Sequence, residues 1–366
     1  INRHYLQKYK RKIIKTYKTM NRLSEIINKD AENILKKVDL SELEGKSVLI
    51  TGASGLIGIY FLACLKILSG NKKNGKITAI CGNKYPFYLN DLINYPEVEV
   101  IVGDLTNYEF RQKLPMADYI IHAAGYGQPE RFMENPIKTL KLNTETTFCL
   151  FDKLKTEGKF LFLSTSEVYS GLTNPPHKES EIGSTNTTHP RSCYIEAKRC
   201  GEAICNDYRT KGVQAKSARL SLAYGPGTKP GDLRVLNSFI QKAIQGNIEL
   251  LDQGEAKRTY CYILDAIEIL WNILLFGKEP VYNVGGISSV TIADLAKKIG
   301  KHMDVPVVFP KILSDKISGA PVDVSLDMEK IKNEFGKTEY FSFDEGLAKT
   351  IEWQKELYKI NQKNEK

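Results

Sequence analysis

The sequence predicts an α/β fold with a doubly wound, mostly parallel sheet, a smaller C-terminal α/β lobe and an N-terminal helical arm. Three observations support this prediction. A strand-like run at residues 48–50 leads through a glycine-rich turn into an apolar helical stretch that reaches Leu68 and is closed by Gly70. Strand-like and helical runs then alternate, which is typical of a parallel sheet covered on both faces. The 366 residues also exceed what one hydrophobic core usually holds.

The composition is that of an ordinary globular protein. With 42% hydrophobic and 26% charged residues, the chain is neither disordered nor fibrous. It contains no apolar run of about 18 residues, and the first residues are charged from Arg3 onward. We therefore expect a soluble cytoplasmic protein. The seven cysteines are scattered and include no C-x-x-C pair, so we expect buried reduced thiols and no metal site.

Residues 1–44 are expected to form a basic amphipathic arm. The first 22 residues carry eight Lys and Arg and no acidic residue, within a formal net charge of +9. An apolar stripe recurs at steps of three and four: Leu6, Tyr9, Ile13, Tyr17, Met20, Leu23 and Ile27. We favour a helix that packs this stripe on the body or on a second subunit. A membrane-surface helix is the second interpretation, but such helices usually carry Trp or Phe on the apolar face, and this stripe has neither. Nucleic-acid binding comes last, because no recognised binding module follows the basic stretch.

Residues 45–225 are expected to form a dinucleotide-binding domain. The first strand runs into Gly52, Ala53, Ser54, Gly55, Leu56, Ile57 and Gly58. Gly52 allows a tight turn, Gly55 a close approach of backbone to pyrophosphate, and Gly58 close packing of the helix on the sheet. Phosphates would lie at the helix N-terminus. Further strands are expected at residues 76–80, 97–102, 119–123, 160–164 and 214–220.

The acidic residue that usually binds the adenosine ribose, about 20 positions after the glycines, is absent. The second strand ends in Cys81, Gly82, Asn83 and Lys84. Asn83 can hydrogen-bond a ribose, whereas Lys84 can pair with a 2′-phosphate. The sequence therefore leaves NAD and NADP both open.

A catalytic pair is indicated by Tyr194 and Lys198, four residues apart at the start of a helical stretch and so on one helix face. An ammonium beside a phenol favours the phenolate and would lower the tyrosine pKa. Thr165, Ser166 and Glu167 follow directly after a predicted strand. Together with the glycine turn, these residues predict hydride transfer between a sugar hydroxyl and a nicotinamide.

With these motifs the sequence resembles the extended short-chain dehydrogenase/reductase family, in its nucleotide-sugar epimerase, dehydratase and decarboxylase branch. The resemblance covers residues 45–355 and includes the Rossmann glycine turn. Its other motifs are Gly103-Asp104-Leu105, His122-Ala123-Ala124-Gly125, the run from Asn135 to Asn143, and Tyr224-Gly225-Pro226-Gly227. The chain looks most like UDP-glucuronate decarboxylases, which share its T-S-E-V-Y, N-P-I-K-T, R-S-C-Y and R-V-x-x-x-F-I runs.

The resemblance implies roles for these residues. Asp104, Leu105, Ala123, Ala124, Gly125 and Asn143 would join the glycine turn in holding the cofactor, expected to be NAD. Tyr194 would be the base at carbon 4 of a nucleotide-linked hexose or uronate, with Lys198 lowering its pKa and Thr165 bonding the reacting hydroxyl. Glu167 and Ser166 would act at carbon 5. The substrate-binding residues would be Arg234, Arg258 and Tyr224.

The expected reaction is oxidation at carbon 4, loss of carbon dioxide from the resulting β-keto acid, and return of the hydride. A 4,6-dehydratase is the main alternative, although Ser166 stands where many dehydratases have an acid. A 4-epimerase ranks third, because that reaction needs no carboxylate at carbon 5 and would give Glu167 no chemical role. A catalytically silent NAD(P)-binding sensor is a different class of function, and the presence of Thr165, Tyr194 and Lys198 together argues against it.

Several departures from the family pattern concern the substrate. Leu222 replaces the asparagine that usually meets the diphosphate, Ile195 and Ala197 replace family residues between the catalytic pair, and the loop 171–190 differs. These changes suggest an altered sugar or nucleotide. Residues 226–366 are expected to form the substrate lobe, partly interleaved with the first domain. A homodimer is the family habit, and no nucleic-acid partner is expected.

Overall fold

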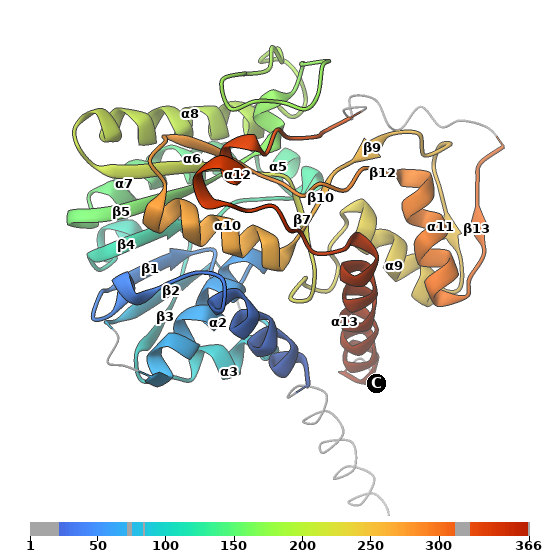
Figure 1. The fold of residues 1–366 in the computed structure, drawn as a ribbon, viewed down its shortest axis with the longest axis horizontal. Helices are drawn as coiled ribbons and strands as arrows, with labels where there is room; N and C mark the ends of the chain where they lie inside the picture. Colours follow the sequence, from blue (N-terminus) through green and yellow to red (C-terminus); the bar gives the residue numbers. More distant parts are fainter. Residues whose placement is uncertain (1–21, 72–74, 83–84, 312–322, 365–366) are drawn as a thin grey trace, which may run out of the picture.

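The computed structural model describes residues 22–71, 75–82, 85–311 and 323–364. Its centre is a seven-stranded sheet in the order β11-β6-β5-β4-β1-β2-β3, with every neighbouring pair parallel (Figure 1). The strands are β1 (Val48–Thr51), β2 (Ile77–Cys81), β3 (Val98–Val102), β4 (Ala117–His122), β5 (Leu154–Thr165), β6 (Gln214–Leu220) and β11 (Val281–Val284). The predicted doubly wound parallel sheet is confirmed. Strand order reverses between β1 and β4, and ligands of such sheets bind outside the carboxyl ends at this point.

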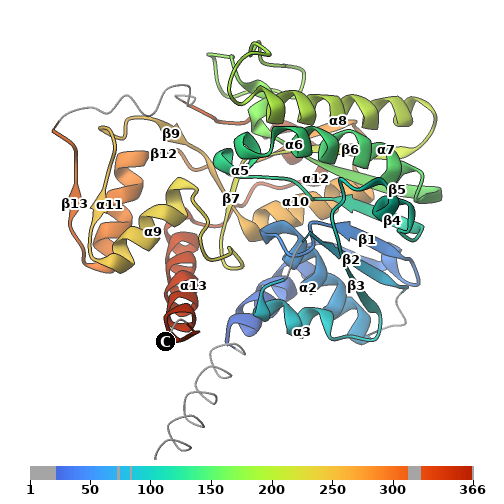
Figure 2. The same cartoon turned by 180° about the vertical axis from the view of Figure 1, so that it is seen from behind.

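Both faces of the sheet are covered, so alternate strand residues enter two different cores. Leu49, Ile120 and Phe162 point to one face, and Ile50, Ile121 and Leu161 to the other. The first face is covered by α6 (Pro136–Asn143), α7 (Glu145–Phe151) and α8 (Ser192–Thr210), and the second by α2 (Leu56–Asn71) and α10 (Ile263–Phe276) (Figure 2). The helix α2 runs through Gly70 to Asn71 instead of closing at that glycine.

Short elements connect these layers. They are η1 (Ser41–Leu43), η2 (Phe87–Leu89), α3 (Asn90–Ile93), α4 (Tyr108–Gln112), α5 (Pro129–Glu134), η3 (Ser166–Tyr169) and α12 (Glu329–Phe335). All seven cysteines are free, and five of them are buried. None of the described helices has the length and apolar character needed to cross a membrane.

A smaller lobe stands beside the carboxyl ends of the large sheet. Its elements are α9 (Val235–Gln245), β8 (Ile248–Glu249), β9 (Lys257–Arg258), β12 (Val290–Thr291), α11 (Ile292–Met303), β13 (Val307–Val308) and α13 (Phe343–Asn364). Between them the chain returns to the main body, because β10 (Tyr260–Tyr262) pairs with β7 (Leu222–Tyr224) and β11 pairs with β6. The segment after residue 226 therefore alternates between the lobe and the body.

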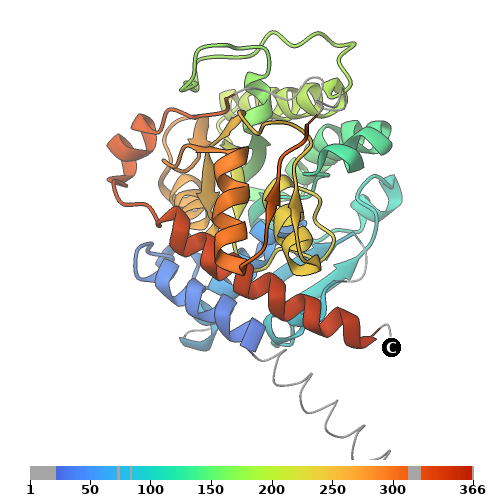
Figure 3. The ribbon, with the colours of Figure 1, turned by 90° about the vertical axis from the view of Figure 1, so that its right-hand side faces the viewer.

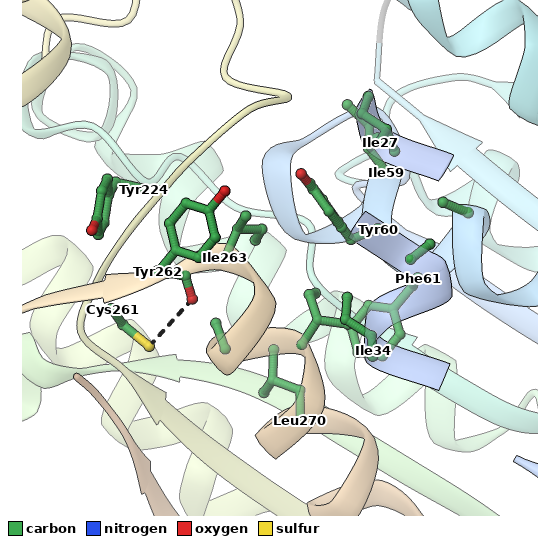
Figure 4. Close-up of a cluster of buried hydrophobic side chains, with 14 of the residues drawn as sticks. Ile27, Ile34, Ile59, Tyr60, Phe61, Tyr224, Cys261, Tyr262, Ile263 and Leu270 are labelled. Carbon is green, nitrogen blue, oxygen red and sulfur yellow. Dashed lines mark hydrogen bonds between the residues drawn. The ribbon is translucent and has the colours of Figure 1, made fainter. Parts of the chain in front are cut away.

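The end of the predicted arm belongs to the main core. Residues 22–35 are helical, and Leu23 and Ile27 are fully buried. Figure 4 places Ile27 and Ile34 beside Ile59 and Phe61 of α2. The apolar side chains before residue 44 therefore help to complete the core. The expected packing on the body is confirmed for Leu23 and Ile27, whereas the stripe from Leu6 to Met20 lies outside the described residues.

Candidate functional site

The glycine turn follows β1 at the carboxyl edge of the sheet, as predicted. Gly52 has φ +67°, and a Cβ there would lie 2.6 Å from the carbonyl oxygen of Ala123. A Cβ at Gly58 would lie 2.4 Å from the carbonyl oxygen of Gly52. Larger residues at either position would therefore push the turn away from β4 or from its own helix. The helix α2 begins at Leu56, and the backbone N–H groups of a helix's first turn, which have no partner within the helix, can bind an anion.

A buried histidine fixes the end of β4 against β1. His122 Nε2 lies 3.0 Å from the carbonyl oxygen of Leu142, and Nδ1 lies 2.8 Å from Thr51 Oγ1. Burial, with a contribution from the charge of Lys198, lowers the pKa of His122 to about 3. The neutral ring thus donates to Leu142 and accepts from Thr51, whose oxygen accepts the N–H of Ala124 at 3.1 Å. This chain of hydrogen bonds holds the backbone of Ala123, Ala124 and Gly125 beside the glycine turn.

Three of the predicted catalytic residues come together where β5 meets α8. The side chain of Thr165, at the end of β5, shares a hydrogen bond with the hydroxyl of Tyr194, in the first turn of α8. Lys198, one turn later, donates from Nζ to the carbonyl oxygen of Leu163 at 2.5 Å. A Cβ on Gly125 would lie 3.7 Å from that nitrogen. The cluster therefore faces the segment that follows β4.

The pKa values of this pair differ from the expectation. Burial raises the pKa of Tyr194 to about 12, against opposing effects of Thr165, Arg191 and Arg234. Burial also lowers the pKa of Lys198 to about 7, against the charge of Glu202. The tyrosine pKa is thus raised and not lowered by its surroundings, because loss of hydration disfavours both the phenolate and the ammonium.

Glu167 lies in a cationic environment that the sequence did not reveal. Its carboxylate forms an ion pair with Arg191, and 22% of its side chain is exposed. Burial raises the pKa of Glu167, against the charges of Arg191, Arg258 and His189. Arg258 comes from β9 in the smaller lobe, so both parts of the molecule contribute. Ser166, the neighbour of Glu167, is buried.

Phe132 is a second residue that sequence reasoning missed. Its ring stacks on Tyr194 with centroids 4.5 Å apart and planes within 3°. The guanidinium of Arg191 lies 5.6 Å from the centroid of the same ring. Phe132 comes from α5 and carries no recognisable motif, whereas Arg191 stood in the R-S-C-Y run without an assigned role. Phe132 contacts Tyr194 and Arg191 because α5 packs against the start of α8 in the folded chain.

The predicted substrate residues divide into two groups. Arg234 is the N-cap of α9, forms an ion pair with Asp232 at 2.6 Å, and acts electrostatically on Tyr194 and Tyr260. Arg258 acts on Tyr260 and on Glu167, so each arginine lies near a residue of the catalytic cluster. Tyr224 is not brought to this cluster. Only 3% exposed, it donates to the carbonyl oxygen of Phe343 at 3.3 Å and lies in the core (Figure 4).

The remaining predicted cofactor residues have local partners. The carboxylate of Asp104 accepts from Thr106 and pairs with Lys138 at 3.1 Å. Leu105 is buried. Asn143 is fully buried and donates to the carbonyl oxygen of Thr139 at 2.8 Å. Asn83 and Lys84, on which the choice between NAD and NADP depended, lie outside the described residues.

Comparison with known proteins agrees with this geometry. Residues 48–285 match the model of the NAD dependent epimerase/dehydratase family. UDP-glucuronic acid decarboxylase 6 of Arabidopsis thaliana is 31% identical over 306 residues, covering 82% of this chain and 86% of that protein. UDP-glucuronic acid decarboxylase 1 of Xenopus tropicalis is 30% identical over 324 residues, covering 87% and 74%.

Solved structures share the fold. The dTDP-glucose 4,6-dehydratase DesIV from Streptomyces venezuelae, solved with NAD and TYD, superimposes with a TM-score of 0.72 at 23% identity, covering 85% of this chain and 97% of that chain. UDP-glucose 4-epimerase from Thermotoga maritima, solved with UDP-glucose, gives a TM-score of 0.71 at 23% identity, covering 85% and 99%. These two neighbours catalyse different reactions, so the fold leaves the choice of reaction to the site.

Proposed function

Because the chain belongs to the NAD-dependent epimerase/dehydratase family, we propose that it is a nucleotide-sugar decarboxylase that acts on UDP-glucuronate or a closely similar nucleotide uronate. Relatives at about 30% identity that bear this name support the proposal over most of the chain. The observation that carries it is the surroundings of Glu167. Arg191 and Arg258 place positive charge beside the carbon 5 residues, which suits a sugar that itself carries a carboxylate.

The cofactor of this proposal is NAD. The glycine turn at Gly52, Gly55 and Gly58, with Ser54, Leu56 and Ile57, would hold its diphosphate at the start of α2. Ala123, Ala124 and Gly125 would line the nicotinamide side, and Lys198 would bond the adjacent ribose. NAD supplies the hydride acceptor for carbon 4.

Tyr194 takes the proton from the carbon 4 hydroxyl while hydride leaves that carbon. Thr165 orients both oxygens through its hydroxyl. Since burial keeps the pKa of Tyr194 near 12, the proton transfer needs stabilisation of the phenolate as it forms. Lys198 can provide it in its protonated form, which its pKa of about 7 makes available near neutral pH.

The 4-ketone makes the uronate a β-keto acid. The bond between carbon 5 and carbon 6 breaks, its electron pair enters the carbon 4 carbonyl as an enolate, and carbon dioxide leaves. Ser166 would orient the departing carboxylate, and Glu167 or water would supply the proton to carbon 5. Hydride returns to carbon 4 and Tyr194 returns the proton, which leaves a pentose. Arg234 and Arg258 would bind the substrate diphosphate. Homodimerisation and a cytoplasmic location are further parts of this proposal.

The test is incubation of the purified protein with NAD and a panel of nucleotide sugars, followed by mass spectrometry of the products. Loss of carbon dioxide from a nucleotide uronate is expected. Loss of water from a neutral hexose would instead support a 4,6-dehydratase, and an unchanged mass with a changed configuration a 4-epimerase. Tight NAD binding without turnover of any nucleotide sugar would support the sensor.

A further inference from the structure

A lysine of the connection between β7 and α9 reaches into the glycine turn. The ammonium of Lys229 donates to the hydroxyl of Ser54 at 3.1 Å. Ser54 lies between Gly52 and Gly55 and is only 8% exposed. The two residues are 175 positions apart, so this contact exists only because the connection folds back over the start of α2. No motif in the sequence pointed to it.

The backbone on both sides of Lys229 is fixed. Trp353 of α13 donates from its indole nitrogen to the carbonyl oxygen of Thr228 at 2.9 Å. The hydroxyl of Tyr88 donates to the carbonyl oxygen of Gly227 at 3.3 Å. A Cβ on Gly227 would lie 3.2 Å from Leu56, in the first turn of α2. The connection is thus attached to α2, η2 and α13, and its lysine is directed at the phosphate-binding end of α2.

The charge of Lys229 is poorly compensated within the protein. Burial lowers its pKa, and although the Cys81 thiol opposes this effect, the charge of Arg131 adds to it. No ion pair with a carboxylate is found for Lys229 within residues 22–71, 75–82, 85–311 and 323–364. Desolvating an ammonium without an anion is unfavourable, which makes an incoming anion the natural partner.

We propose that Lys229 binds a phosphate group of the dinucleotide cofactor, so that the connection leading to the smaller lobe closes the cofactor site over the glycine turn. The inference rests on the proposed function, because it requires a dinucleotide at this edge of the sheet. A phosphate has two sources here: the diphosphate, present in both NAD and NADP, and the 2′-phosphate of NADP alone. Both offer the charge-assisted hydrogen bond that Lys229 and Ser54 can make.

The experiment uses the full chain and measures binding directly. Dissociation constants of NADH and NADPH are determined by fluorescence titration for the wild type, Lys229→Met, Lys229→Arg and the control Lys242→Met. Lys242 lies nearby in sequence, on α9, and donates to the backbone carbonyl of Glu249. We expect Lys229→Met to weaken binding about 10- to 100-fold, Lys229→Arg to stay within about threefold by keeping the charge, and Lys242→Met to match the wild type.

Thermal unfolding without nucleotide separates binding from structure. Lys229→Met removes a poorly hydrated charge, so its unfolding temperature should equal or exceed that of the wild type. Weaker binding of both nucleotides assigns Lys229 to the diphosphate, and weaker binding of NADPH alone assigns it to the 2′-phosphate. Unchanged affinities of Lys229→Met for both nucleotides would overturn the proposal. A lower unfolding temperature of Lys229→Met, together with a loss of affinity in Lys229→Arg, would overturn it as well. If the wild type binds neither nucleotide, the proposed function fails as well.

Discussion

Tyr194 and Lys198 lie in the same buried region, and burial disfavours the charged form of each side chain. Burial holds the tyrosine pKa near 12 and the lysine pKa near 7. At neutral pH the phenol of Tyr194 is therefore protonated before the reaction. Because Lys198 titrates near neutral pH, its protonated form is available when the phenol loses its proton. The Thr165 hydroxyl lies beside the phenol and offers the path for that proton.

Replacing Tyr194 with phenylalanine removes the hydroxyl and keeps the ring that stacks on Phe132. We expect turnover to fall at least about 10³-fold, as for loss of a general base, with NADH affinity unchanged. Steady-state kinetics and fluorescence titration measure the two quantities. Tyr224→Phe is the matched control, because it removes a buried hydroxyl that donates to the carbonyl oxygen of Phe343. Turnover of Tyr194→Phe within tenfold of the wild type would remove Tyr194 from this role.

Glu167→Gln should separate the two halves of the reaction. The amide keeps the shape of the side chain but cannot donate a carboxylic proton to carbon 5. We therefore expect reduced cofactor to form and carbon dioxide to leave, while protonation of carbon 5 and the return of hydride slow about 100-fold. Stopped-flow absorbance follows the cofactor, and product analysis follows the sugar. The control is Glu196→Gln, which makes the same chemical change at a glutamate that pairs with Arg199 within α8. Normal complete turnover in Glu167→Gln would mean that carbon 5 chemistry does not pass through this residue.

At the scale of the secondary-structure elements, the ends of β1 and β4 depend on a histidine that stays neutral. His122 lies among Thr51, Leu142 and Ala124, with both ring nitrogens bonded. Protonating the ring would remove its acceptor and place a charge near Lys198. The network therefore keeps its geometry only while His122 remains unprotonated.

This arrangement makes stability depend on pH. The folded pKa of about 3 lies below the ordinary value of about 6.5, so the unfolded chain binds the proton more readily. The contribution of neutral His122 to the free energy of unfolding is fully present above about pH 6.5. It is lost as the pH falls toward about 3, at up to about 1.4 kcal/mol per pH unit.

Urea unfolding between pH 8 and pH 5 measures this slope. His122→Gln should show a shallower fall in the free energy of unfolding than the wild type, although it will be less stable at pH 8. His302→Gln, on an exposed position of α11, is the control for loss of one histidine. Equal slopes in the wild type and His122→Gln would contradict the assignment of a neutral, buried His122.

Across the whole molecule, the beginning and end of the described chain are packed together. The helix at residues 22–35 lies next to α13 in Figure 3. Arg22 forms an ion pair with Glu352, and Lys349 forms one with Asp30 at 3.4 Å. The same helix places Ile27 against α2, so it links the cofactor helix to the last helix of the smaller lobe.

Two truncations separate the basic segment from the core segment. Deleting residues 1–40 removes Leu23, Ile27, Ile34, Val38 and Leu40, all at least 96% buried. At about 1.5–3 kcal/mol for each buried side chain, the loss approaches the whole stability of about 5–15 kcal/mol, so we expect no cooperative folding. Deleting residues 1–21 keeps these contacts and should retain a cooperative transition. Circular dichroism during urea unfolding checks both, and a wild-type midpoint after deletion of residues 1–40 would contradict the packing.

The sequence predicted those features that depend on local pattern. Strand and helix periodicity gave the sheet, and spacing located the turn at Gly52 and the pair Tyr194 and Lys198, because these signals lie within one element or one turn. Boundaries differed where hydrogen bonding extended a strand beyond its apolar run, as in β5, which was expected from residue 160 and begins at Leu154. The position of Tyr224 could not be read from its motif, since its neighbour Phe343 lies 119 residues further along the chain.

The sequence by itself determined the fold class and where the cofactor and catalytic motifs lie, because each follows from residues near one another along the chain. Only the tertiary structure decided which side chains surround them. Arg191 and Arg258 reach Glu167, Phe132 stacks on Tyr194, and Lys229 meets Ser54 because separate elements converge at the carboxyl ends of the strands. Burial at that convergence also set the pKa values of Tyr194 and Lys198, since desolvation depends on everything packed around a group and not on its neighbours in sequence.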